Sequence, residues 1–254
     1  MTVSVLPEIV VLFLLSFARL GTMVMLMPAL GEQNVSTRIR LSLALVLSFV
    51  LYPLFVGLYP SGILDNPMRV VMFFFGEFVI GSVIGLSARL IVSALQIAGT
   101  TISYQASMAL AQSFDPTIGT QGALIGNFLA VVGVVVVFAM EIHHVAIMAL
   151  HDSYLLFPPG VWLPVGDVTQ MAISTIAGAF KLGISLAAPF IVFGIVFNLG
   201  MGLLNRLMPQ VQIFFIAMPA NVGIALLLLM ATIGTMMMWY ADHLRATLGQ
   251  FLAG

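Results

Sequence analysis

Long apolar runs, separated by short polar connections, make up most of this chain. A helix needs about 20 mostly apolar residues to cross the hydrocarbon core of a bilayer, because each residue adds only about 1.5 Å. Six runs approach or exceed that length: Ile9–Leu30, Leu41–Tyr59, Val70–Leu95, Leu124–Leu150, Ile173–Leu204 and Ile213–Tyr240. Backbone polar groups in lipid must be satisfied within the structure, and none of the runs alternates with the period of a barrel strand. The pattern therefore predicts an all-α integral membrane protein with about six long apolar helices.

The last three runs are longer than a single perpendicular span requires. Pro189 and Pro219 lie within the fifth and sixth runs, and a proline inside a helix removes one backbone donor. Long hydrophobic helices also adapt to a bilayer by tilting or kinking. We therefore expect some of these helices to be kinked or broken, within a single membrane domain that covers residues 1–254.

The composition supports the same class of protein. Apolar residues account for 61% of the 254 residues and charged residues for 7%, against about 45–50% and about 25% in soluble globular proteins. The 8 basic and 9 acidic side chains are too few to give a soluble domain of this size a polar surface. A net charge of −1 provides no basic surface for nucleic acid. The absence of cysteine excludes disulfides, thiol nucleophiles and thiolate metal sites.

A polar stripe interrupts the apolar pattern between residues 82 and 107. Its members recur at intervals of three, four or seven residues, which places them on one face of a helix: Ser82, Arg89, Ser93, Gln96, Thr100, Ser103 and Ser107. One interpretation is a helix-packing seam, in which small hydroxyl side chains are common. The other is a surface that lines an aqueous or export path, because unpaired polar groups avoid lipid. Beyond the stripe, Asp115-Pro116 and the glycines of 112–122 predict a loop.

Three ionisable residues lie inside apolar runs. Glu77 and Arg89 are twelve residues apart in the third run, which is roughly 18 Å along one straight helix and about 120° around it. They cannot pair with each other, and Arg19 in the first run also needs a partner or water. An unpartnered charge near the bilayer centre costs about 2.5–3.5 kcal/mol. Because a proton relay needs more intramembrane carboxylates than this chain supplies, the pattern favours a subunit buried in an assembly.

No set of residues fits a catalytic or cofactor site. Glu141, His143 and His144 lack the spacing of a metalloprotease motif. Ser185 lacks the glycine that follows a rhomboid-type nucleophile, and the single lysine, Lys181, belongs to no phosphate-binding glycine loop. We therefore expect no enzyme activity, no cofactor and no bound metal.

Several motifs together resemble one family of membrane proteins. The most specific is Asn198-Leu199-Gly200-Met201-Gly202-Leu203-Leu204-Asn205-Arg206-Leu207-Met208-Pro209-Gln210, and the others are Arg19-Leu20-Gly21, Gly76-Glu77, Ile80-Gly81, Ile84-Gly85 and Asp115-Pro116. In these motifs and in its length, the chain resembles the FliR/SctT family, whose members are subunits of the export gate of type III secretion systems. The similarity covers essentially the whole chain. It departs from the family pattern at Ser36, where the family usually has a proline before two arginines.

The resemblance implies a fold of helical hairpins within a hetero-oligomeric export gate. In that family one such chain joins several FliP-like and FliQ-like subunits, with FlhB attached. The part from about 1 to 177 would be FliP-like, and the part from about 178 to 254 would be FliQ-like. The helices would face other subunits more than lipid. The complex would lie in the bacterial inner membrane at the flagellar basal body, because the signature is closer to the flagellar branch.

The resemblance also implies two sets of site residues. The central loop of the family closes the pore, and the matching stretch here is Tyr104–Gly122, with Phe114 as the expected occluding side chain. The expected plug and pore-lining residues are Tyr104, Ser107, Met108, Phe114, Asp115 and Pro116. The expected assembly contacts are Arg19, Glu77, Arg89, Asn205, Arg206 and Pro209.

The sequence thus predicts a non-catalytic pore subunit through which unfolded export substrates cross the inner membrane. Energy would come from a separate ATPase and from the proton gradient. Two alternatives stay open. One is a small-molecule or ion transporter with a midplane site at Glu77 and Arg89. The other is an intramembrane hydrolase that depends on Ser185 or His144.

Overall fold

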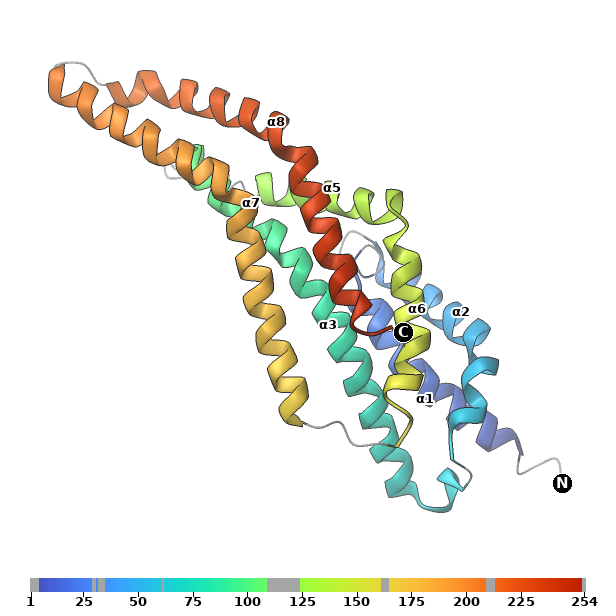
Figure 1. The fold of residues 1–254 in the computed structure, drawn as a ribbon. Helices are drawn as coiled ribbons and strands as arrows, with labels where there is room; N and C mark the ends of the chain where they lie inside the picture. The colour runs from blue at the N-terminus through green and yellow to red at the C-terminus, as the bar shows by residue number, and fades with distance from the viewer. Residues whose placement is uncertain are drawn as a thin grey trace. The chain divides into compact units, whose positions relative to one another are not determined.

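The computed structural model describes residues 5–28, 31, 35–60, 62–108, 124–160, 165–208 and 213–252, and the regular structure of these residues is entirely helical (Figure 1). The helices are α1 Val5–Leu26, α2 Thr37–Phe55, α3 Pro67–Gln105, α5 Leu124–Ala139, α6 Ile142–Leu156, α7 Val165–Leu207 and α8 Ile213–Gly249, with the short 3-10 helices η1 Val56–Leu58 and η2 Ile63–Asp65. The predicted all-α fold is therefore confirmed.

The predicted number of long apolar helices is also confirmed. Five helices, α1, α2, α3, α7 and α8, are long and apolar enough to cross a membrane, and α5 with α6 makes a sixth if the bent pair counts as one span. The third helix is longer than the run Val70–Leu95 indicated, because it continues through the polar stripe to Gln105. Polar residues such as Gln96 and Thr100 end the apolar run without ending the helix.

The break in the long helices lies in the fourth run rather than at a proline. The helices α7 and α8 continue through Pro189 and Pro219. In the fourth run, α5 ends at Ala139 and α6 begins at Ile142, with a bend of 74° between them. Glu141 has a φ of +57°. A residue in this left-handed conformation cannot continue a right-handed helix, so the backbone of Glu141 accounts for the break.

Ser36, at which the chain departs from the pattern of the family it resembles, begins a helix in the structure. It is the N-cap of α2, with a φ of −58° that a proline ring would also impose. Its hydroxyl accepts a hydrogen bond from the backbone N–H of Ile39 at 3.5 Å. Ser36 therefore caps the start of α2.

The residues fall into two compact units. Unit 1 comprises Met1–Leu90, Val137–Ile176 and Leu244–Gly254, and unit 2 comprises Ile91–Val136 and Ala177–His243. One boundary lies at Ile176 and Ala177, beside the predicted division at 177/178, but each unit contains segments from both predicted parts. The division into FliP-like and FliQ-like parts stays a prediction.

In unit 1, two glycines allow α1 and α3 to approach closely. A Cβ added at Gly81 would overlap the backbone carbonyl of Arg19, and one added at Gly85 would overlap Leu26. By contrast, no described atom lies within 4 Å of a Cβ added at Gly76. Of the small residues in this stretch, Gly81 and Gly85 therefore form the helix contact, as their spacing of four residues indicates.

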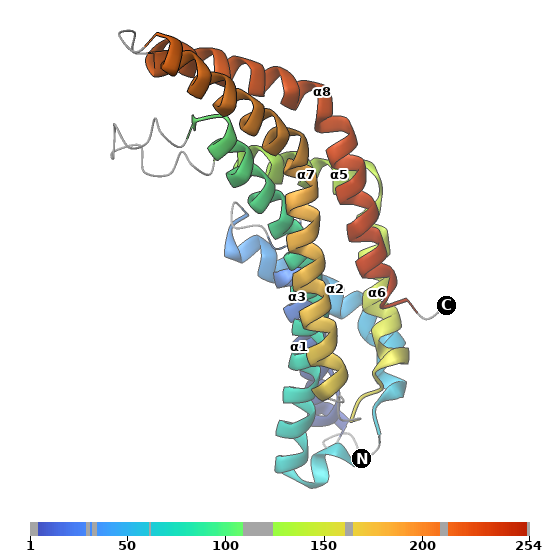
Figure 2. The same cartoon turned by 60° about the vertical axis from the view of Figure 1, so that its left-hand side comes forward.

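In unit 2, the last part of α3 packs against α5, α7 and α8. A Cβ added at Gly99 of α3 would overlap the backbone of Gly126 in α5, and one at Gly183 of α7 would lie 2.8 Å from the Ile97 side chain. Within unit 2, the last part of α7 and the first part of α8 run side by side (Figures 1 and 2). The backbone contact between Gly99 and Gly126 brings the last turns of α3 next to the first turn of α5.

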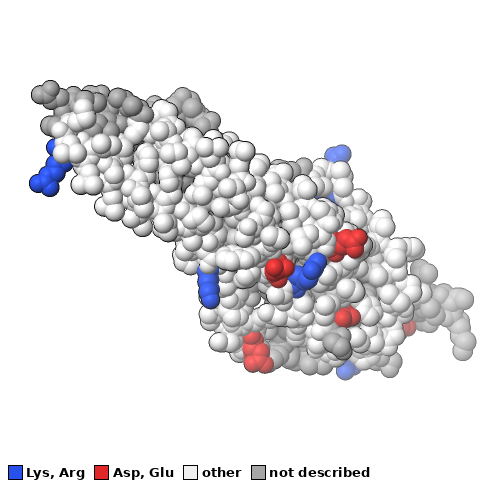
Figure 3. Space-filling view, turned by 45° about the horizontal axis from the view of Figure 1, so that its top comes forward, with Lys and Arg blue, Asp and Glu red and all other residues white. Residues whose placement is uncertain are grey.

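The surface has few charges and many large apolar side chains. Figure 3 shows one face on which Lys, Arg, Asp and Glu are scattered among a large majority of other residues. Large exposed apolar side chains occur on α2, α3, α7 and α8, and include Phe49, Phe75, Leu207 and Met230. Water does not tolerate an apolar surface of this extent, so lipid or other protein must cover it.

Candidate functional site

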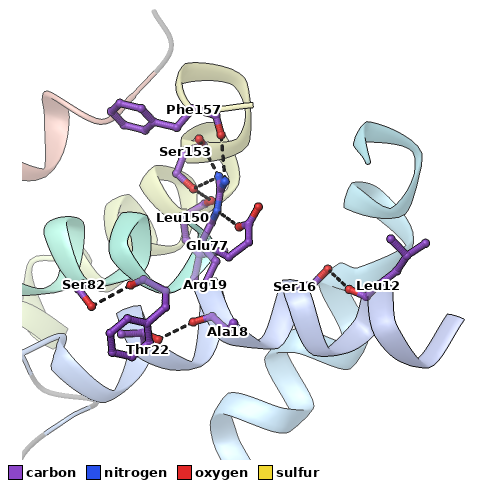
Figure 4. A network of polar contacts seen from close by, with 11 residues as sticks. Leu12, Ser16, Ala18, Arg19, Thr22, Glu77, Ser82, Leu150, Ser153 and Phe157 are labelled. Carbon is purple, nitrogen blue, oxygen red and sulfur yellow. Dashed lines mark hydrogen bonds and ion pairs between the residues drawn. The ribbon is translucent and has the colours of Figure 1, made fainter. Parts of the chain in front are cut away.

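Arg19 of α1 and Glu77 of α3 form a buried ion pair (Figure 4). The guanidinium Nε donates to the carboxylate Oε2, and the two side chains are only 0% and 1% exposed. The sequence analysis excluded a pair between Glu77 and Arg89 and required another partner for each charge. The two partners belong to different helices of the same chain, which the spacing of residues along one helix could not reveal.

The remaining nitrogens of Arg19 bind the end of α6. Nη1 donates to the Ser153 carbonyl at 3.0 Å and lies 3.4 Å from the Ser153 hydroxyl, and Nη2 donates to the Phe157 carbonyl at 2.9 Å. Both carbonyls lie at the C-terminal end of α6, which carries a partial negative charge, and the Ser153 carbonyl also accepts from the Phe157 N–H at 2.9 Å. Arg19 therefore caps α6 with a full positive charge while it neutralises Glu77.

An aromatic face covers the guanidinium on another side. The Cζ atom of Arg19 lies 4.0 Å from the centroid of the Tyr154 ring. Phe55 stacks on Tyr154 with ring centroids 3.9 Å apart, and Tyr59 meets Tyr154 edge to face at 6.4 Å.

These residues, Arg19, Glu77, Ser153, Tyr154 and Phe157, are called the Arg19 cluster below. The cluster joins α1, α3 and α6, and its carboxylate is occupied by an arginine. Removing one partner of such a buried pair typically costs about 3–5 kcal/mol, because the other charge is left unpaired. The structure gives Arg19 and Glu77 partners inside their own chain. Their role in contacts to other subunits stays a prediction.

The stretch expected to form the plug begins where α3 ends. Tyr104 lies in the last turn of α3 and is 72% exposed, and Met108 is partly buried. Ser107 has a φ of +58°, so the helix cannot continue through it. The remaining expected plug residues, Phe114, Asp115 and Pro116, lie outside the described residues. The assignment of a plug stays a prediction.

Asn221 of α8 binds the end of α3, and the sequence analysis missed it. Its side-chain Nδ2 donates to the Gln105 carbonyl at 3.2 Å and to the Ser107 hydroxyl at 2.6 Å. The residue is only 1% exposed. The available signal was a single amide side chain within the apolar run Ile213–Tyr240, which needs a polar partner to be buried there. These two hydrogen bonds are called the Asn221 contact below.

The polar stripe satisfies several of its own hydroxyls. Ser82 donates to the Phe78 carbonyl at 2.8 Å, and Ser103 donates to the Gly99 carbonyl at 2.8 Å. Such bonds to the preceding turn are a common way for serine to remain inside a helix. These two hydroxyls therefore do not need water or another protein segment as a hydrogen-bond acceptor. Both interpretations of the stripe, a packing seam and a pore lining, stay open.

Three of the other expected assembly residues are exposed. Arg89 lies on α3, and Asn205 and Arg206 lie in the last turn of α7. A cation in the last turn of a helix interacts favourably with the free carbonyls there. Pro209 lies outside the described residues. In the part of the chain that the structure describes, no three His, Cys, Asp or Glu side chains gather closely enough to hold a metal ion.

The comparisons with known proteins agree with the motifs. The chain matches the family described as bacterial export proteins, family 1, over residues 10–247. The flagellar biosynthetic protein FliR of Caulobacter vibrioides is 40% identical over 240 residues, which cover 93% of this chain and 94% of that protein. The proteins of the same name from Aquifex aeolicus and Escherichia coli are 26% and 27% identical over 93% and 89% of this chain, and over 90% and 85% of their own lengths. These matches confirm the resemblance to the FliR/SctT family. The chain belongs to the bacterial export proteins, family 1.

Proposed function

We propose that this chain is a non-catalytic subunit of the core export gate of a flagellar type III secretion apparatus. One observation carries the proposal: relatives named flagellar biosynthetic protein FliR match nearly the full length of both chains. The name of the matching family, bacterial export proteins, supports export as the process. In this role the chain forms part of the inner-membrane pore through which unfolded substrates pass, and part of the plug that closes it.

The proposed partners are FliP-like and FliQ-like subunits and FlhB, in the inner membrane at the flagellar basal body. The exposed apolar surface supports a position among other membrane subunits, because lipid or protein has to cover it. The exposed cation of Arg89 supports it as well, since Arg89 lies within a helix long enough to span the bilayer. A partner carboxylate or water would remove the penalty for that charge.

The plug is proposed to comprise the stretch after α3, from Tyr104 to Gly122. Its support in the structure is the arrangement of the two helices that flank it. The backbone contact between Gly99 of α3 and Gly126 of α5 holds these helices together near the points where α3 ends and α5 begins.

Deletion of residues 109–117 tests the plug. The open pore should conduct ions, so cells that carry the complex should leak ions more than cells with the parent chain. The same deletion in cells that lack the FliP-like subunit is the control, because no pore forms there and leakage should stay at background. Unchanged conductance in cells that assemble the complex would contradict the plug.

The geometry gives less support to the transporter alternative. That alternative needs Glu77 as a carboxylate that can bind a substrate or a proton. Glu77 is instead paired with Arg19 and almost fully buried. A midplane transport site would also need an approach from water. No observation favours the hydrolase alternative over the export gate.

A further inference from the structure

The start of α2 carries two arginines and no acidic side chain in its first turn. Arg38 is exposed and makes no hydrogen bond or ion pair with the described residues. Arg40 donates from Nη1 to the Gly31 carbonyl at 3.3 Å and from Nη2 to the Thr37 hydroxyl at 3.2 Å. Both acceptors are neutral, and the beginning of a helix is also the positive end of its dipole. These contacts therefore leave a concentration of positive charge at this end of α2.

An exposed apolar surface extends from these arginines along α2. Its members are called the α2 face below, and they are Leu41, Leu45, Val46, Phe49, Val50 and Leu54. Leu41, Leu45 and Phe49 follow Arg38 at intervals of three, four and four residues, so they lie on the same side of the helix as Arg38. A helix of 19 residues is about 28 Å long, close to the hydrocarbon thickness of a bilayer. When α2 crosses the bilayer, Arg38 therefore lies at the level of the lipid headgroups.

The buried side of α2 has a different composition from the α2 face. Ala44 and Ser48 are fully buried, and Tyr52 meets Phe13 of α1 edge to face with ring centroids 6.0 Å apart. Small residues four positions apart allow membrane helices to approach closely. The helix therefore places small residues where it packs on its own chain, and large side chains where nothing in the described chain covers it.

The composition of the α2 face favours acyl chains over another helix as its cover. Helix interfaces in membranes are rich in small residues and in polar side chains that form hydrogen bonds across the contact. The α2 face has only large apolar side chains, and the exposed Ser42 hydroxyl beside it donates to the Ile39 carbonyl of its own helix at 2.9 Å. Of the described helices long enough to cross a membrane, α2 also has the smallest buried share. The α2 face is then an exception to the expectation that these helices mostly face other subunits.

We propose that the α2 face and the arginines beside it bind an anionic phospholipid. The headgroup phosphate contacts Arg38, the charge of Arg40 adds to the attraction, and the acyl chains lie along Leu45 and Phe49. An arginine can keep its stem on an apolar surface while its guanidinium reaches the headgroups. One cation at this level favours an anionic lipid about fivefold. The proposal goes beyond the proposed function, because it requires neither a plug nor a particular partner subunit.

Photo-cross-linking in intact cell membranes tests what covers the α2 face. Leu45 is replaced by p-benzoylphenylalanine in the tagged full-length chain, because this position lies roughly 10 Å along the helix from Arg38. The irradiated chain is purified and its mass is measured. The expected main product is the chain with one phospholipid attached. A main product in which the chain is joined to another protein would overturn the proposal, because a subunit would then cover the face.

The same photo-reactive chain measures the choice of headgroup. It is purified with the subunits that accompany it and placed in vesicles that contain equal amounts of phosphatidylglycerol and phosphatidylcholine with the same acyl chains. Because the chains are identical, a difference between the two adducts at position 45 reports the headgroup alone. The phosphatidylglycerol adduct should exceed the phosphatidylcholine adduct about fivefold. Arg38→Gln should bring the ratio close to one, and Arg38→Lys should keep most of the preference.

The matched control removes an exposed arginine elsewhere in the chain. Arg206→Gln changes the last turn of α7, in the other unit, and should leave the adduct ratio at position 45 equal to that of the parent. Glu32, the nearest acidic residue to Arg38 in the sequence, lies outside the described residues. If it or another group already neutralises Arg38, the parent shows no preference for phosphatidylglycerol, which would overturn the proposal. A preference that Arg38→Gln leaves unchanged would overturn it as well.

Discussion

The Arg19 cluster of unit 1 and the Asn221 contact of unit 2 both bury polar groups among apolar helices, and both attach α3 to its neighbours. In the Arg19 cluster a guanidinium meets a carboxylate, two backbone carbonyls and an aromatic ring. In the Asn221 contact a neutral amide makes two hydrogen bonds and leaves its oxygen without a partner among the described residues. One arrangement satisfies each nitrogen of the guanidinium, whereas the other leaves a buried acceptor and a left-handed serine.

The difference follows from the free energy of burying charge. A buried ion without partners is so unfavourable that the chain must surround it completely or not bury it. A neutral amide tolerates partial satisfaction, because its unpaired oxygen costs much less than an unpaired charge. In the Arg19 cluster every guanidinium nitrogen has a partner and only the neutral Tyr154 hydroxyl lacks one among the described residues, whereas the Asn221 contact leaves its amide oxygen unpaired. We therefore expect the Arg19 cluster to contribute more to the stability of the chain than the Asn221 contact.

Among the variants that test this comparison, removal of the Glu77 carboxylate should have the largest effect on recovery of the complex. Glu77→Ala leaves the Arg19 guanidinium buried without its anion, and a loss of about 3–5 kcal/mol is typical of such a change. Recovery of the detergent-solubilised complex with the proposed FliP-like partners should fall strongly. Glu141→Ala is the control, because the side chain of Glu141 is 78% exposed and its loss should not change recovery.

A double variant distinguishes the charge from the shape of the cluster. Arg19→Met with Glu77→Leu removes both charges and keeps apolar volume, which is often nearly neutral for a buried pair. It should recover much of the complex that Glu77→Ala loses. Normal assembly of Glu77→Ala itself would show that the cluster does not hold the helices together.

A smaller effect is expected from the backbone contact next to the cluster. Gly81→Ala places a methyl group on the backbone carbonyl of Arg19, and backbone cannot rotate away as a side chain can. Overpacking of this kind costs about 1–3 kcal/mol. Gly76→Ala lies on the same helix with no described atom within 4 Å of the new methyl. Thermal unfolding of the solubilised complex should occur at a lower temperature for Gly81→Ala than for Gly76→Ala. Equal unfolding midpoints for the two variants would show that the contact between α1 and α3 does not determine thermal stability.

The sequence predicts much of this fold because lipid imposes strong rules. A span needs length and apolarity, so the six runs locate the helices well. The helical spacing of the polar stripe predicted that α3 continues beyond Leu95, and a split was among the outcomes expected for the fourth run, but the sequence did not indicate the residues at which these helices end. Hydropathy records how polar a residue is, but not its φ angle, and Glu141 and Ser107 leave the helix through a positive φ. A proline marks a possible kink in the sequence, whereas Pro189 and Pro219 both lie inside continuous helices.

The candidate site was predictable in its parts but not in its pairing. Arg19 and Glu77 stand out because charges are rare in apolar runs. Their pairing, and the contribution of Ser153 and Phe157, depend on how separate helices pack. Carbonyl acceptors belong to the backbone, so no residue type announces them. Asn221 is a neutral residue in a long apolar run, and its role depends on contacts with Gln105 and Ser107 that only the three-dimensional structure supplies.

The smallest effect concerns the aromatic face of the Arg19 cluster, and it shows whether that cluster is held by charge alone. Tyr154→Leu removes the ring that covers the guanidinium and stacks on Phe55, and a desolvated cation–π contact is worth about 2 kcal/mol. Tyr154→Phe keeps both ring contacts. The thermal midpoint of the solubilised complex should therefore fall for the leucine variant and stay near the parent value for the phenylalanine variant. If both variants fall equally, the tyrosine hydroxyl contributes more than the ring, and the cluster resembles the Asn221 contact in relying on a neutral polar group.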